Sequence, residues 1–166
     1  KDEVNKHLSK INKEYKGTVN IRHFVHVLFN DIGVDKIKAQ VTKPLTGLKV
    51  AAHPGCHYAR PSHVLNTDDP FKPVHLKELI KASGATLVEY HCETLCCGQL
   101  VRNQDEKVAN GILKTKMDGV IDAGADVLVV NCPACFLELD NQQKNLKEEG
   151  KDYKVPIIFI TQLLAL

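Results

Sequence analysis

The chain has 166 residues, of which 43% are hydrophobic and 25% charged, and this suits one soluble globular domain with at most a short helical extension. A net charge of +2 and the absence of tryptophan argue against binding to nucleic acid or to an anionic membrane surface. No apolar run approaches the roughly 18 residues that span a bilayer, and the charged start KDEVNKHLSK is not a secretory signal.

The N-terminal part has helical periodicity but no chemical signature. Apolar residues spaced along 4–15 predict a first helix that ends at Gly17. A second helix is expected to begin at Asn20, as its N-cap, and to break at Gly33. A short amphipathic stretch then reaches Lys43. Packing, or docking to a partner, is the expected role of this part.

From Leu48 onward, short apolar runs alternate with longer amphipathic segments. The alternation predicts an α/β fold with a mostly parallel sheet and helices on both faces, which is a Rossmann-like arrangement. We therefore predict a helical lead-in over 1–46 and a cysteine-rich α/β domain over 47–166. Strands are expected at 48–53, 85–91, 126–131 and 155–160, and helices at 68–83, 103–123, 133–150 and from a cap at Thr161 onward.

All six cysteines follow predicted strands. The loops after parallel strands share one edge of the sheet, where open α/β folds place their ligand sites. We therefore expect sulfurs that are far apart in the sequence to converge at this edge. Cys56 follows the first strand, Cys92, Cys96 and Cys97 follow the second, and Cys132 and Cys135 follow the third.

The cysteines indicate thiol or metal chemistry in a reducing, cytoplasmic compartment. Packing alone is a poor explanation for six on one edge, and structural disulfides belong to secreted chains. Thiolate-rich sites select zinc or iron–sulfur clusters. Zinc takes four ligands, and five thiolates also exceed the four of an ordinary cubane, which indicates an unusual cluster. The Cys132-Pro-Ala-Cys135 pair on its own also fits a thioredoxin-like redox motif.

The spacing of the cysteines resembles that of a known family. One cysteine, 39 residues, Cys-Cys-Gly, 33 further residues and Cys-x-x-Cys together resemble the cysteine-rich CCG domain. With the helical lead-in before Pro44, the chain resembles the C-terminal half of the B subunit of heterodisulfide reductase. Related subunits occur in succinate and fumarate reductases and in lactate and glycolate oxidoreductases. Because the chain carries one motif and does not begin with methionine, we expect it to be a piece of a longer subunit.

The resemblance implies an iron–sulfur oxidoreductase subunit, in which a noncubane [4Fe-4S] cluster serves reduction of the coenzyme M–coenzyme B disulfide in methanogenesis. It implies other subunits as partners, including an iron–sulfur electron donor, and a small-molecule disulfide as substrate; the isolated fragment is not expected to be active alone. A zinc-binding structural module is the alternative, as is a CCG subunit of the related reductases. Cys92 lies off the motif and is expected not to be a ligand, but a half-buried thiol or one that lies beside the ligands. The implied ligands are Cys56, Cys96, Cys97, Cys132 and Cys135.

Several basic residues flank the cysteine loops, although the sequence assigns no catalytic residue. His53, His57 and His91 are candidates for donating a proton or a hydrogen bond to a cluster sulfur. Arg60 and Arg102 can meet an anionic substrate or partner. Solvent-facing positions are the more ordinary role for all of them.

Overall fold

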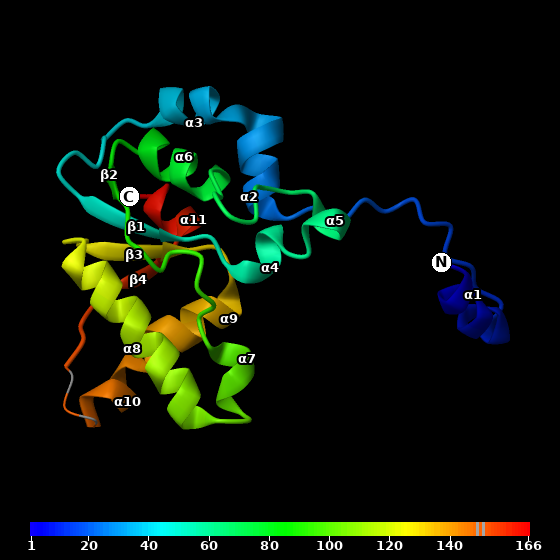
Figure 1. The fold of residues 1–166 in the computed structure, drawn as a ribbon. Helices are drawn as coiled ribbons and strands as arrows, with labels where there is room; N and C mark the ends of the chain where they lie inside the picture. The colour runs from blue at the N-terminus through cyan, green and yellow to red at the C-terminus, as the bar shows by residue number, and fades with distance from the viewer. Residues whose placement is uncertain (149, 151) are drawn as a thin grey trace.

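The computed structural model describes residues 1–148, 150 and 152–166, and it contains the predicted parallel sheet (Figure 1). Its four strands lie in the order β2-β1-β3-β4, all parallel. Ala51 stands opposite both Val88 and Leu128, and Leu128 stands opposite Ile157. The strands are β1 (Lys49–His53), β2 (Thr86–Val88), β3 (Val127–Val130) and β4 (Ile157–Phe159).

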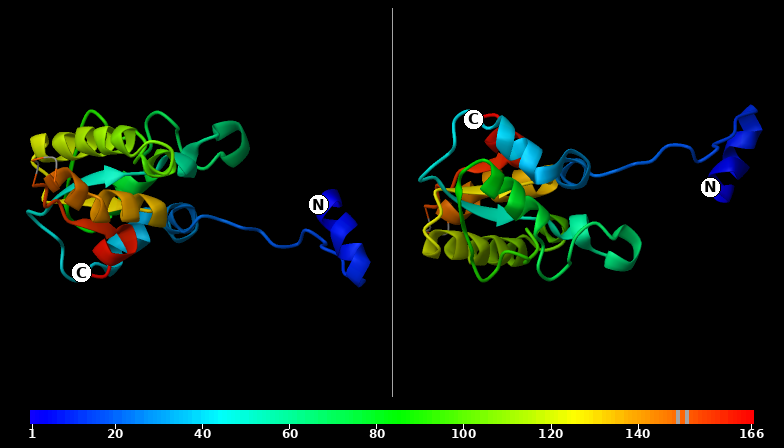
Figure 2. Two further views of the ribbon diagram at one scale, coloured as in Figure 1. Left: turned by 90° about the horizontal axis from the view of Figure 1, so that it is seen from below. Right: turned by 90° about the horizontal axis from the view of Figure 1, so that it is seen from above.

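Helices cover both faces of the sheet, as predicted (Figure 2). Alternate strand residues point to opposite faces, so Leu128 packs in one core and Val129 in the other. We call the two sides the α8 face and the α6 face. The α8 face is covered by α8 (Glu106–Asp122), the π-helical turn η3 (Leu137–Asn141) and α10 (Gln143–Glu148). The α6 face is covered by α2 (Phe24–His26), α6 (His75–Ala82) and α11 (Ile160–Leu163).

The N-terminal helix lies away from the body of the molecule (Figures 1 and 2). It ends earlier than predicted, because Asn12 turns the chain with a left-handed backbone (φ 55°). Tyr15 therefore lies outside the helix, where its N–H donates to Asn5 Oδ1 over 2.7 Å. The N-terminal elements are α1 (Asp2–Leu8) and the 3-10 turn η1 (Ser9–Ile11).

The second predicted helix begins later than expected. Asn20 is not its N-cap, because the ring Nδ1 of His23 accepts the N–H of Val25 over 3.2 Å and caps α2 instead. The predicted break at Gly33 is confirmed by its positive φ of 89°. The segment continues as the π-helical turn η2 (Val27–Gly33) and α3 (Val34–Gln40).

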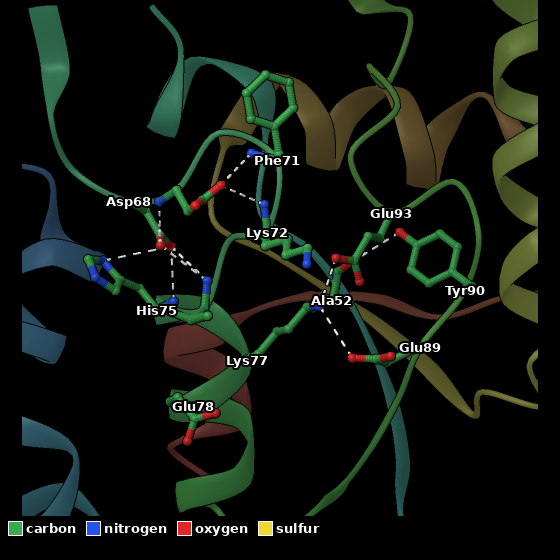
Figure 3. A network of polar contacts seen from close by, with 12 residues as sticks. Ala52, Asp68, Phe71, Lys72, His75, Lys77, Glu78, Glu89, Tyr90 and Glu93 are labelled. Carbon is green, nitrogen blue, oxygen red and sulfur yellow. Dashed lines mark hydrogen bonds and ion pairs between the residues drawn. The ribbon is translucent and has the colours of Figure 1, made fainter. Parts of the chain in front are cut away.

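Within the α/β region, side-chain caps move three predicted helix starts. The helix expected from residue 68 begins at His75, because the carboxylates of Asp68 and Asp69 accept backbone N–H groups and hold a loop instead (Figure 3). The helix expected from residue 103 begins at Glu106, because the Asp105 side chain caps α8 by accepting the N–H of Val108. Thr161 is not a cap, because the Gln162 side chain accepts the Phe159 N–H at the start of α11.

The helix predicted over 133–150 is a succession of shorter pieces that begins with Pro133, as expected. Its last described helical residue is Glu148, residue 149 lies outside the described residues, and Gly150, the predicted end, lies in a turn with a positive φ of 89°. Two short helices after β1 were not predicted. Among the described residues, no helix is both long and apolar enough to cross a bilayer. The remaining elements are α4 (Cys56–Ala59), α5 (Ser62–Leu65), α7 (Gln99–Arg102) and α9 (Pro133–Phe136).

Candidate metal centre

The loops after β1, β2 and β3 enclose one cavity of about 310 Å³ at the carboxyl edge of the sheet. Because parallel strands end at the same edge, three loops that are distant in sequence meet there. All six cysteines are free thiols. Cys92 is buried outside the cavity, where its Sγ donates to the Thr115 carbonyl over 3.5 Å. The cysteines that line the cavity are Cys56, Cys96, Cys97, Cys132 and Cys135.

A buried cluster at the inner end of the site brings together His53, Cys97 and Cys135, whose potential ligand atoms lie within 4.8 Å of one another. His53 Nε2 is 3.3 Å from Cys135 Sγ. Burial lowers the pKa of His53 to about 4, so the imidazole is neutral at neutral pH. The hydrogen bond from Cys135 lowers the pKa of Cys97 to about 4, and the same contact raises the pKa of Cys135. Cys97 therefore carries a thiolate, which is the form that binds metals.

Glycine allows the loops after β1 and β3 to approach closely. Gly55 has a positive φ of 74°, and a Cβ there would lie 3.1 Å from Asn131 Oδ1 and 3.9 Å from Cys135 Sγ. Any larger residue would push the two loops apart. Directly after Gly55, Cys56 begins α4, while Cys132 directly precedes α9.

The vicinal pair places its two sulfurs in different environments. Cys97 is buried and Cys96 is half-buried, and both line the cavity. Gly98 follows with a positive φ of 97° and donates its N–H to Cys96 Sγ over 3.4 Å. The turn at Gly98 thus allows both adjacent cysteines to face one cavity from different depths.

Two arginines tie the cysteine loops to one another. Arg60 donates to the Thr94 carbonyl over 3.0 Å, which links the end of α4 to the loop before Cys96. Arg102 Nε donates to Glu138 Oε2 over 2.8 Å, and its Nη1 donates to Asn110 Oδ1 over 3.0 Å. Because α7 follows the Cys-Cys-Gly turn and η3 follows Cys135, the ion pair fixes these two segments relative to each other. The expectation that Arg102 is a solvated surface residue is therefore wrong, and its contact with an anionic substrate or partner stays a prediction.

The structure adds residues that the sequence did not single out. Among the histidines, His57 lines the cavity as considered from the sequence, whereas His91 is exposed and lines a different hollow. The lead-in contributes His23, whose ring lies 4.7 Å from that of Tyr58 in the cavity wall. Lys116 of α8 is buried beneath the loop after β2; its position between Leu113 and Val120 on an apolar helix face was the available signal.

Unpartnered polar atoms indicate that the cavity suits a bound group. Asn131 is 1% exposed, and neither atom of its side-chain amide has a hydrogen-bond partner among the described residues. Within the same part of the chain, His53 Nδ1 is also buried without a partner. An unsatisfied buried polar group costs about 1–3 kcal/mol, and Asn131 lines the same cavity as the sulfurs. With five thiol donors, this environment fits a thiophilic metal or an iron–sulfur cluster.

A parallel α/β domain with sulfur donors gathered at one sheet edge defines a cysteine-rich domain with metal-centre chemistry. Residues 50–140 match the family described as CCG: Cysteine-rich domain, and the chain belongs to this family. The match includes all three cysteine-bearing loops.

Several relatives match nearly the whole chain. A protein of Archaeoglobus profundus that is named as similar to the B subunit of heterodisulfide reductase is 36% identical over 98% of this chain and 56% of the relative. The B subunit of the ferredoxin:CoB-CoM heterodisulfide reductase of Methanosarcina mazei is 39% identical over 98% of this chain and 55% of the relative. The 8-methylmenaquinol:fumarate reductase membrane anchor subunit of Wolinella succinogenes is 32% identical over 100% of this chain and 58% of the relative. The chain thus spans little more than half the length of these relatives.

Proposed function

We propose that this chain is an iron–sulfur redox region of a protein similar to the B subunit of heterodisulfide reductase. It holds a noncubane [4Fe-4S] cluster and serves the reduction of the disulfide between coenzyme M and coenzyme B. The observation that carries the proposal is the convergence of five cysteine sulfurs on one cavity. The similarity to subunits named for this reaction supports the substrate. The proposed ligands are Cys56, Cys96, Cys97, Cys132 and Cys135.

Five thiolates in the observed arrangement favour a cluster over a single ion. Zinc is satisfied by four ligands, and an ordinary cubane also takes four. Cys96 and Cys97 are adjacent in the chain, yet both reach the cavity, so each can serve a different iron. The buried Cys97 and Cys135 form the inner end of the site, and the half-buried Cys56, Cys96 and Cys132 form its more accessible part.

Reduction of a disulfide consumes two electrons and two protons and yields two thiols. When bound, the cluster supplies electrons singly and offers iron to a substrate sulfur. The residues of this chain hold and orient that centre. Neutral His53 can donate its Nε2–H to the Cys135 sulfur, and the Asn131 amide can donate to a sulfur inside the cavity. Exposed His57 at the cavity wall is placed to hold a proton near the accessible sulfurs.

The electrons require a partner, because the five cysteines that line the cavity form a single site and Cys92 lies outside it. Relatives of this chain are named as subunits of ferredoxin-dependent and quinol-dependent reductases. We therefore propose an iron–sulfur donor subunit as the partner, in a complex that also includes the remainder of the longer protein.

Metal analysis of protein prepared without oxygen tests the proposal. We expect about four irons per chain, a matching amount of acid-labile sulfide, and visible absorption that bleaches on reduction. One zinc per chain with no iron would contradict the cluster and favour a structural zinc module, for which His53, Cys97 and Cys135 already offer three close donors.

A further inference from the structure

Helix α8 buries a lysine directly behind the Cys-Cys-Gly loop. The Lys116 side chain is 0% exposed, and its Nζ donates to the carbonyl of Cys92 over 2.7 Å and to that of Glu93 over 3.3 Å. The same Nζ lies 5.3 Å from the centre of the Tyr90 ring. The Tyr90 hydroxyl in turn donates to the Ala52 carbonyl at the end of β1 over 3.1 Å (Figure 3). The ammonium group is thus fixed against the loop after β2, and Tyr90 links this loop to β1.

Among the described residues, this buried cation has no carboxylate partner. Glu93 is near in the sequence, but its carboxylate pairs with Lys77 of α6 over 2.7 Å (Figure 3). Within the part of the chain that the structure describes, no carboxylate oxygen lies within 4.0 Å of Lys116 Nζ. Carbonyl oxygens and an aromatic face solvate an ammonium but do not neutralise it. A buried charge without a counter-charge is strongly unfavourable. An anion near Lys116 is therefore needed to stabilise its ammonium group.

The cysteine site supplies that anion. Burial lowers the pKa of Lys116 to about 8, while the sulfurs of Cys92, Cys135 and Cys97 act in the opposite direction. Only one of these, Cys92, lies outside the cavity. A centre with five thiolate ligands carries net negative charge, and each added electron makes it more negative. A fixed positive charge nearby, in a medium of low dielectric constant, stabilises the reduced state more than the oxidised one.

We propose that Lys116 is the buried counter-charge of the sulfur centre and raises its reduction potential. The assignment rests on the proposed iron–sulfur function. Lys116 then has two roles. Its hydrogen bonds hold the loop that carries Cys96 and Cys97, and its positive charge makes the centre easier to reduce. Lys116 acts through space and touches no proposed ligand directly.

The test compares two lysines on the same helix. Lys116→Met removes the buried charge and keeps the length of the side chain, whereas Lys114→Met removes an exposed charge two residues away. Iron content and the midpoint potential are measured in an anaerobic redox titration followed by visible absorption and electron paramagnetic resonance. If iron is retained, we expect Lys116→Met to lower the ratio of reduced to oxidised centre at least tenfold at a fixed potential. For a one-electron centre this corresponds to a midpoint potential lower by about 59 mV. Lys114→Met should change this ratio less than about twofold, because solvent screens its charge.

An unchanged potential in iron-loaded Lys116→Met would overturn the assignment. If that variant loses iron, the assignment is tested with two further variants, Lys116→Gln and Lys116→Arg. The Gln variant keeps a hydrogen-bond donor without the charge, and the Arg variant keeps the charge. Iron held by the Arg variant but not by the Gln variant supports the counter-charge, as does a lowered potential in an iron-loaded Gln variant. A Gln variant at the wild-type potential, or loss of iron in both, contradicts it. Wild-type protein without iron would instead refute the proposed function, and this assignment with it.

Discussion

The two faces of the sheet are covered by similar amphipathic helices, yet they differ in sulfur content. The core on the α8 face includes Cys92, Cys97 and Cys135, and Cys96 and Cys132 pack against it. Among the described residues, the core on the α6 face includes no cysteine. The α8 face therefore supplies the buried sulfurs beside the candidate metal centre, whereas the α6 face contributes the Tyr58 side chain to the cavity wall and otherwise packs apolar side chains against the strands.

Buried polar side chains follow the same division. On the α6 face, within the described part of the chain, His75 and Ser83 are the buried polar residues of the covering helix and its end. The α8 face has more of them, and they bond to loops and to neighbouring helices. In the described part of the chain, the buried polar residues of its helices are Asn110, Lys116, Glu138 and Gln143. A polar, cross-linked layer of this kind positions ligands more rigidly than apolar packing alone.

The largest expected effect separates two cysteines of the same core. Cys97→Ser should abolish or rearrange the iron centre, because a hydroxyl is a harder and far less acidic ligand than a thiol. Cys92→Ser should leave iron content and visible absorption nearly unchanged and reduce the free energy of unfolding by about 1 kcal/mol. Iron and sulfide analysis of the two variants provides the measurement. Equal loss of iron in both would show that Cys92 is a ligand.

Removal of the buried ion pair tests whether the polar layer supports the α8 face. Arg102→Ala leaves the Glu138 carboxylate buried without its charged partner, and we expect the free energy of unfolding to fall by about 3–5 kcal/mol. Arg22→Ala, which breaks a more exposed pair with Asp31, is the control and should cost at most about 1 kcal/mol. Urea unfolding of the metal-free proteins compares them. Similar small losses would mean that the Arg102 pair contributes no more than a surface contact.

A pair of leucines compares the faces directly. Leu113 on the α8 face and Leu79 on the α6 face are both 0% exposed, so replacement by alanine should cost about 2–5 kcal/mol in either case. Of these two cores, as far as the structure describes them, only the one with Leu113 includes cysteines. We therefore expect a chelator to remove iron faster from Leu113→Ala than from Leu79→Ala at equal stability loss. Equal rates of iron release would remove the functional distinction between the faces.

The smallest expected effect concerns the contact between α8 and Cys92. A Cβ at Gly119 would lie 2.7 Å from Cys92 Sγ, so Gly119→Ala should destabilise the protein by about 1–3 kcal/mol. Gly111→Ala on the same helix has no atom within 4 Å of the new methyl group and should instead stabilise by up to about 1 kcal/mol. Thermal unfolding measures both. In a double-mutant cycle, Cys92→Ala should recover part of the Gly119→Ala loss; strict additivity would show that the two residues are not in contact.

The sequence predicts the strands, their parallel arrangement and the edge at which the cysteines meet, because each depends on local patterns and on a general rule for parallel sheets. Helix starts are less predictable, since side chains that find their partners only in the folded chain decide them. Asp68 holds a loop where a helix was expected, and His23 replaces Asn20 as a cap.

The contacts that hold the cysteine loops of the candidate metal centre in place are harder still to predict from the sequence. The pattern shows Lys116 on an apolar helix face, but it does not reveal the carbonyls that Lys116 meets on the loop after β2. Arg102 likewise resembles a surface residue until η3 brings Glu138 beside it. Such contacts join segments that are distant in sequence, so only the folded arrangement identifies them.

The most direct test of the central claim is anomalous diffraction from anaerobically grown crystals, recorded on both sides of the iron edge. We predict several iron peaks inside the cavity, bonded together to the sulfurs of all five proposed ligands, with none at Cys92. The five sulfurs to be checked are those of Cys56, Cys96, Cys97, Cys132 and Cys135. A single peak that appears only in data recorded above the zinc edge would show zinc and contradict the proposed cluster. Iron bound without the Cys96–Cys97 pair would contradict the proposed set of ligands.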